Sequence, residues 1–307
     1  MLALIRASHP GPTVVVTAVG SALAAGVGRG PGGTLLAGVA VLSGQLSIGW
    51  SNDWIDRTRD RAIGRADKPL AVKPGGSESR PSQPGASGAS LRPRPGASGG
   101  PGGADGPGGG LTPRAVAGAA FVALAACVPL SLANGVLAGL VHLAAVACGW
   151  LYNLRLKATV VSPLPFAVAF GLLPAFVTLG LPGRPWPSWW ALVAGGLLGM
   201  GAHFANVVPD LPDDIALGVR GLPQRLGPTG ARLGAAVLLV AASAVIALGP
   251  AERTGAVTIV GLSAVVLALG GGLLAARGNV RRAAFAVTVA VAVIDVAMFV
   301  AQGSRLV

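Results

Sequence analysis

Long apolar runs dominate the chain. Splitting them wherever charged residues, prolines or clustered glycines intervene gives nine candidate spans, each near the roughly 20 residues that a helix needs to cross a bilayer. They are centred on residues 12–28, 33–50, 115–132, 134–151, 163–181, 189–208, 230–249, 255–275 and 283–302. Almost nothing polar separates the third run from the fourth, so eight spans is the alternative count. The pattern predicts an all-α, polytopic membrane protein whose first run is a retained helix rather than a cleaved signal peptide.

Composition and charge sharpen this prediction. Of the 307 residues, 52% are hydrophobic and 11% are charged, which excludes a soluble globular protein. The nine spans place 19 of the 23 Lys and Arg residues on one face of the membrane. Because basic residues accumulate on the cytoplasmic side, we expect a cytoplasmic N-terminus, and the net charge of +12 does not indicate a nucleic-acid partner.

The gap after the second span contains a segment of a different kind. Gly, Pro and Ser make up 26 of the 37 residues from 74 to 110, which leaves too few apolar groups to stabilise a fold. We interpret 74–110 as a disordered insertion in the cytoplasmic loop between the second and third helices. The chain 1–307 is otherwise expected to be a single membrane domain.

The acidic residues gather after two of the spans, and both groups fall on the predicted cytoplasmic face. The first group is Asp53, Asp56, Asp60 and Asp67, and Asn52, Asp56 and Asp60 share one stripe if the second helix continues. The second group is Asp210, Asp213 and Asp214, where Pro209 and Pro212 predict a helix break followed by a short restart.

Oxygen ligands at this spacing suit Mg²⁺, which completes its shell with substrate phosphates and water. The alternative is that the acids only pair with neighbouring arginines at solvated helix ends. Such local pairs are worth a few tenths of a kcal/mol. They do not account for seven of eleven acids meeting at two helix ends on one face. We therefore favour two groups of ligands that together hold a metal-bridged diphosphate.

These residues resemble the UbiA superfamily of intramembrane prenyltransferases. The stretch 52–60 matches that family's N-D-x-x-D-x-x-x-D motif, and 210–214 matches its D-x-x-x-D motif. Residues 218–227 are similar to the family's G-x-(R/K)-T-L-P-x-x-L-G tail, with Gly221 in place of Thr. Lys68-Pro69-Leu70 is similar to the family's Arg-Pro-Leu, which follows the first motif.

The resemblance implies a function. We expect Mg²⁺-dependent transfer of an isoprenyl group from a prenyl diphosphate to a hydrophobic or aromatic acceptor, with a quinone-type precursor as the default. It also implies about nine helices around a central cavity in the cell membrane, with the lipid bilayer as a partner and the active face toward the cytoplasm. The implied metal ligands are Asn52, Asp53, Asp56, Asp60, Asp210 and Asp214, of which Asp56, Asp60, Asp210 and Asp214 are also the implied catalytic residues.

Further candidates surround these motifs. Those for binding diphosphate are Arg6, Lys68, Tyr152, Arg155 and Lys157. The family has a basic residue four positions after its Tyr. Here Arg155 and Lys157 follow Tyr152 at three and five positions, so which of them contacts diphosphate stays open. The alternative is that both residues anchor the helix at the membrane interface.

Polar residues inside the spans form another set. His203 and Asn206 are candidates on the acceptor side, and a helix-packing hydrogen bond is the alternative for His203. We interpret His142 and Asp295 as helix-packing groups.

Two other functions remain open. A UbiA-type terpene cyclase uses the same motifs without an acceptor, although aromatic residues, which stabilise migrating cations, are only 5% of the chain. An ion-coupled transporter is less favoured, because its ion sites usually lie near the membrane midplane rather than at one face.

Overall fold

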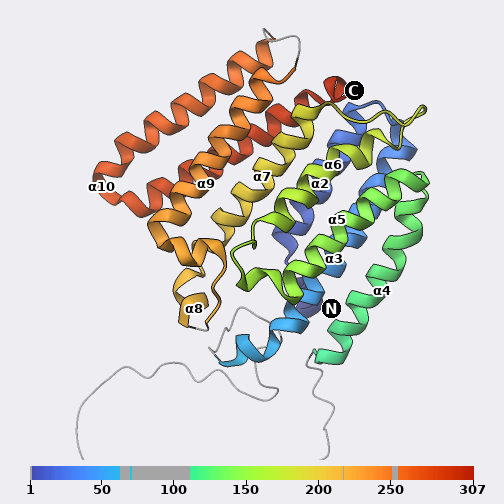
Figure 1. The fold of residues 1–307 in the computed structure, drawn as a ribbon, viewed down its shortest axis with the longest axis horizontal. Coiled ribbons are helices and arrows are strands. Elements are labelled where there is room, and N and C mark those ends of the chain that lie inside the picture. Colours follow the sequence, from blue (N-terminus) through green and yellow to red (C-terminus); the bar gives the residue numbers. More distant parts are fainter. Residues whose placement is uncertain (1, 63–69, 71–110, 217, 251–254) are drawn as a thin grey trace, which may run out of the picture.

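The structure, a computed structural model, describes residues 2–62, 70, 111–216, 218–250 and 255–307. All regular elements in these ranges are helices (Figure 1), which confirms the all-α class for the described residues.

The insertion predicted at 74–110 and the candidate Lys68 lie outside the described residues. In chain order the elements are α1 (Leu2–Ala7), α2 (Pro10–Gly26), α3 (Gly30–Ala62), α4 (Pro113–Leu132), α5 (Val136–Leu154), η1 (Leu156–Ala158), α6 (Leu164–Thr178), α7 (Trp189–Val207), α8 (Leu211–Ala216), α9 (Leu222–Leu248), α10 (Ala256–Ala301) and η2 (Gly303–Arg305).

The long helices form a closed ring. Each of α2 to α7 packs against the next in sequence, α7 packs against α9, α9 against α10, and α10 returns to contact α2. Short connections such as residues 133–135 between α4 and α5 favour antiparallel neighbours. The two termini lie at opposite ends of the bundle (Figure 1). The last turns of α3 and the short helix α8 lie at the same end as the N-terminus.

Several helices have the length and composition of membrane spans. Five in the described residues qualify as long and apolar enough to cross a bilayer: Gly30–Asp60, Pro113–Leu132, Val136–Leu154, Trp189–Val207 and Leu222–Leu248. Shorter apolar helices occur at Pro10–Gly26, Leu164–Thr178, Thr258–Leu267 and Ala286–Ala301. The chain is thus built from membrane-spanning helices, and the count of nine stays a prediction.

The element α10 folds back on itself. Its ribbon follows two antiparallel arms (Figure 1). A Cβ atom placed on Gly261 would overlap the sulfur of Met298, so these residues are in direct contact. In a straight helix their separation of 37 positions would be roughly 55 Å at 1.5 Å per residue. The contact therefore makes α10 a helical hairpin, which agrees with two predicted spans rather than one.

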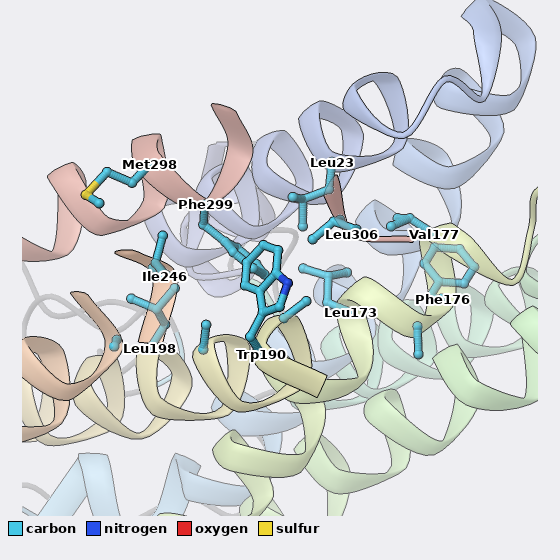
Figure 2. Close-up of a cluster of buried hydrophobic side chains, with 14 of the residues drawn as sticks. Leu23, Leu173, Phe176, Val177, Trp190, Leu198, Ile246, Met298, Phe299 and Leu306 are labelled. Carbon is cyan, nitrogen blue, oxygen red and sulfur yellow. The ribbon is translucent and has the colours of Figure 1, made fainter. Parts of the chain in front are cut away.

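A cluster of buried apolar side chains packs the helices together (Figure 2). Trp190 at the start of α7 meets Phe299 near the end of α10 edge to face, with ring centroids 6.0 Å apart. Leu23 and Leu306 are fully buried in the same cluster. Because lipid gives helices no hydrophobic reason to associate, close van der Waals packing of this kind holds the helices together. Apolar side chains fill this part of the ring, and the acidic residues of α3 and α8 lie toward the end of the bundle where the N-terminus lies (Figure 1).

Candidate active site

The first acidic cluster lies on the last turns of α3. The helix runs unbroken to Ala62 because no proline or glycine occurs after Gly49 within it. This confirms the predicted continuation, so Asn52, Asp56 and Asp60 occupy successive turns on one side. Asp60 is 7% exposed, and the Asp56 side chain is 15% exposed. Asp56 does pair with its neighbour Arg59, whose Nη1 donates to Oδ1 at 3.2 Å, but carboxylates this buried are not a fully solvated helix end.

Asp53 faces a different partner. It is buried, and its Oδ1 atom lies 3.1 Å from Nε2 of His9 in the link between α1 and α2. The same end of α3 is tied to α1 where Trp50 Nε1 donates to the carbonyl of Leu4 at 2.8 Å. Asp53 therefore joins α3 to the N-terminal segment, a role that the sequence did not indicate.

Asn52 is oriented by a second asparagine. Its Nδ2 atom donates to Oδ1 of Asn153 on α5 at 3.2 Å. Asn153 is itself buried and donates from Nδ2 to Ser51 Oγ at 2.8 Å and to the carbonyl of Ile48 at 2.9 Å. Since the amide nitrogen of Asn52 serves this contact, its carbonyl oxygen is the atom with ligand chemistry. Asn153 thereby fixes the first residue of the motif.

Of the two cations that follow Tyr152, Lys157 reaches the acids. Helix α5 ends at Leu154, and the 3₁₀ turn η1 carries Lys157 inward, where its Nζ contacts Oδ1 of Asp56. Arg155 is exposed. Burial lowers the pKa of Lys157, while the charge of Asp56 acts in the opposite direction. The irregular turn explains how a cation five positions after the tyrosine still arrives at the first cluster.

The second acidic cluster lies where α7 gives way to α8. Helix α7 ends at Val207, and α8 begins at Leu211 with Asp213 and Asp214 in its first turn, which confirms the predicted break. The N–H of Asp214 donates to the carbonyl of Asp210 at 2.9 Å. Asp210 and Asp214 are half-buried, whereas Asp213 is exposed. Asp210 therefore immediately precedes α8 and lies one helical turn before Asp214, after the break that ends α7.

Gln224 holds the second cluster from the start of α9. Its Nε2 atom donates to Oδ2 of Asp214 at 2.8 Å. Sequence reasoning singled out the tail that contains Gln224 but gave this residue no role. Neither did it find Asn153 or His9, because their contacts join positions 44 to 101 residues apart and leave no local pattern.

Tyr152 lies in the last turn of α5, near acids of both clusters. Its phenol lies within electrostatic range of both Asp56 and Asp214. Its ring meets Phe166 at 4.9 Å and His203 at 5.5 Å between centroids, both edge to face. His203 stacks on Phe166 at 4.6 Å. An aromatic group thus lies next to the acids on the side of the membrane interior.

The remaining candidates are less close. His203 is buried and lies 3.2 Å from Ser162 through Nε2, the hydrogen bond expected of a helix-packing residue. Asn206 is exposed on α7, and Arg6 is exposed on α1. Farther away, His142 lies 2.8 Å from Ser131, and Asp295 lies 2.6 Å from Ser243, as expected for packing groups.

The donors at this site suit a hard cation that shares its shell with a substrate. Within the described ranges, no three His, Cys, Asp or Glu side chains converge tightly enough to hold a metal alone. Mg²⁺ is commonly held by one or two carboxylates together with phosphate oxygens and water. Asp56 and Asp214 therefore fit Mg²⁺ bound together with a diphosphate.

Comparison with known proteins gives one family. The model of the UbiA prenyltransferase family matches residues 106–301. No curated protein matches the chain by sequence.

Several solved structures share the fold. A UbiA homologue from Archaeoglobus fulgidus bound to GPP and Mg²⁺ is 16% identical, with a TM-score of 0.63 over 98% of this chain and 99% of that one. A UbiA homologue from Aeropyrum pernix K1 without ligand is 19% identical, with a TM-score of 0.64 over 92% and 96%. A digeranylgeranylglyceryl phosphate synthase structure is 16% identical, with a TM-score of 0.61 over 99% and 98%. At these identities the likeness establishes the fold.

Proposed function

The chain belongs to the UbiA prenyltransferase family, and on that basis we propose that it transfers an isoprenyl group from a prenyl diphosphate to a hydrophobic acceptor with the help of Mg²⁺. The observation that carries this proposal is that Lys157 contacts Asp56 of the first cluster while the neighbouring Tyr152 phenol lies within electrostatic range of Asp56 and Asp214. Structures of family members bound to GPP or DMAPP together with Mg²⁺ support it.

In this proposal Asn52, Asp56 and Asp60 hold metal on one side of the diphosphate, and Asp210 and Asp214 hold it on the other. Bound Mg²⁺ supplies charge that stabilises the departing diphosphate. Asp53 is left out of the ligand set, because its carboxylate contacts His9.

Lys157 is our candidate for the diphosphate cation. Without substrate its ammonium rests on Asp56, a proposed metal ligand. With metal and diphosphate bound, this ammonium would be in reach of the phosphate oxygens, where its point charge would stabilise the leaving group. Arg155, exposed at the end of α5, anchors the helix at the interface.

The apolar interior completes the reaction. When the bond between C1 of the prenyl chain and the diphosphate oxygen breaks, positive charge develops on the chain, and water must be kept away until an acceptor attacks. Tyr152, Phe166 and His203 provide the water-poor, aromatic surroundings nearest the acids. The acceptor gives up its proton when the new bond to C1 forms.

The acceptor class is tested in cells. We expect lipid extracts from cells that express the protein to contain a prenylated aromatic compound that is absent from cells expressing Asp56→Asn. Mass spectra that show a prenylated lipid of another class would redirect the acceptor assignment and keep the transferase.

The aromatic group gives a second candidate, cyclisation of the prenyl chain without an acceptor. Purified protein incubated with a C15 or C20 prenyl diphosphate and Mg²⁺ alone separates the two functions. A transferase leaves no cyclic hydrocarbon in this assay, whereas a cyclase produces one.

A further inference from the structure

The connection between α5 and α6, residues 155–163, lies between the two acidic clusters. On one side Lys157 contacts Asp56. On the other side its backbone lies against Gly221, the residue that precedes α9. A Cβ atom on Gly221 would be 2.6 Å from the carbonyl oxygen of Lys157 and 2.9 Å from Oγ of Ser162. The approach is close enough to require a glycine at this position.

Ser162 joins this connection to two helices. Its side chain is fully buried. The N–H of Leu222 donates to its Oγ at 3.1 Å, and Nε2 of His203 on α7 lies 3.2 Å from the same atom. The N–H groups in the first turn of a helix lack partners within that helix, so Ser162 satisfies a donor at the start of α9.

The start of α9 in turn holds the second cluster. Two residues after Leu222, Gln224 donates to Asp214. A chain of short contacts therefore runs from Ser162 through the backbone of Leu222 and the side chain of Gln224 to Asp214. The other end of the connection reaches Asp56 through Lys157.

We propose that residues 155–163 form a strap that sets the spacing between the two acidic clusters, and that Ser162 is a positioning residue for Asp214. This inference rests on the proposed function, because the spacing matters only if both clusters hold one metal–diphosphate group. Gly221 stands where the family tail has Thr, so the close seat of the strap is a feature of this chain.

Metal binding tests the strap directly. Protein purified into lipid nanodiscs is titrated with Mg²⁺ in the presence of geranyl thiolodiphosphate, an analogue that ionises poorly, and the midpoint is read from the unfolding temperature. We expect Ser162→Ala to raise the Mg²⁺ midpoint about 5-fold or more, the loss that one hydrogen bond represents. Gly221→Ala, whose Cβ would press on the Lys157 carbonyl oxygen of the strap and on Oε1 of Gln224, is expected to raise it as well.

Two further variants separate positioning from general stability. Gln224→Ala acts on the same chain of contacts, so combining it with Ser162→Ala should raise the midpoint less than the two single effects together. The matched control is Ser243→Ala, because Ser243 is also a buried serine but bonds to Asp295 on another helix pair. Its Mg²⁺ midpoint should stay within about 2-fold of the wild type even where its unfolding temperature falls.

Opposite results overturn the proposal in distinguishable ways. A wild-type Mg²⁺ midpoint in Ser162→Ala would contradict the proposed role of the strap and would leave the proposed function in place. Should Ser162→Ala fail to fold, a wild-type midpoint in Gly221→Ala has the same meaning. Wild-type protein whose binding of the analogue does not depend on Mg²⁺ contradicts the proposed function itself, and the strap with it.

Discussion

Charged residues that are close neighbours in the sequence contact different partners at this site. Lys157 and Arg155 are two positions apart, yet the first is drawn onto Asp56 and the second is exposed. Asp53 and Asp56 differ in the same way, since one meets His9 and the other Lys157. Neighbouring residues with like charges therefore make matched pairs of variants for separating substrate binding from structure.

Lys157→Met should weaken diphosphate binding and strengthen metal binding to the free protein. Loss of a charged hydrogen bond predicts a KM for the prenyl diphosphate about 10-fold higher or more. Removing the ammonium takes one of two cations away from Oδ1 of Asp56, which Arg59 Nη1 also contacts at 3.2 Å, so Mg²⁺ should bind more tightly without substrate. Steady-state kinetics and calorimetry measure the two effects, with Arg155→Met as the control. Equal effects in both variants would contradict our assignment of the cation.

Asp53→Asn should act on stability rather than on the metal. The substitution weakens a partly buried contact with His9, which predicts a loss of about 1 kcal/mol in the free energy of unfolding. The Mg²⁺ requirement of the folded fraction should not change. Chemical unfolding and a Mg²⁺ titration of activity are the measurements, and a shifted Mg²⁺ midpoint would place Asp53 among the ligands after all.

At the scale of elements, one continuous helix and one broken helix bring the acids together. Helix α3 continues to Ala62 and presents its acids turn by turn, whereas α7 stops and α8 restarts to turn Asp210 and Asp214 inward. The 3₁₀ turn η1 carries Lys157 to Asp56 of the first cluster, and its backbone lies against Gly221 before α9. Regular helix thus positions the first cluster, and irregular backbone positions the second.

The hairpin in α10 predicts a specific cross-link. Cysteines at Gly261 and Met298 should form a disulfide on mild oxidation, because a Cβ atom on Gly261 would touch the Met298 side chain. The cross-linked peptides are identified by mass spectrometry after proteolysis, and the singly substituted proteins are the controls. A straight α10 would hold the two cysteines far apart and give no cross-link.

The sequence predicted the elements better than it predicted their partners. Apolar runs and turn residues located the helices, and the prolines at 209 and 212 predicted the break before α8, because these signals are local. The contacts that Asn153, Ser162 and Gln224 make are long-range hydrogen bonds, which leave no periodic pattern. The spacing of Lys157 stayed ambiguous in the sequence, since a non-helical turn decides which cation points inward.

For the whole molecule, the two ends of the bundle have different tasks. A packed apolar cluster around Trp190 and Phe299 joins the helices at the end where the C-terminus lies. The acids, Tyr152 and Lys157 gather toward the opposite end. We propose that this second end faces the cytoplasm and that nine spans place the termini on opposite sides of the membrane.

Reporter fusions test this topology. A fluorescent protein that folds only in the cytoplasm should be active at the N-terminus, and alkaline phosphatase, which needs the outer compartment, should be active at the C-terminus. The basic residues counted for the nine spans predict this orientation. Activity of the same reporter at both ends would favour an even number of spans, including the alternative count of eight.

The most direct test of the function is Mg²⁺-dependent cleavage of a prenyl diphosphate by the purified protein. With labelled geranyl diphosphate and an acceptor-containing lipid extract, we expect the wild type to release diphosphate and label a lipid, and chelation of Mg²⁺ to stop both. Asp56→Asn and Asp214→Asn should each lower the rate at least about 100-fold, whereas the exposed neighbour Asp213→Asn should stay within about 3-fold of the wild type. Full activity in Asp56→Asn or Asp214→Asn, or turnover without Mg²⁺, would contradict the proposed role of the two acidic clusters.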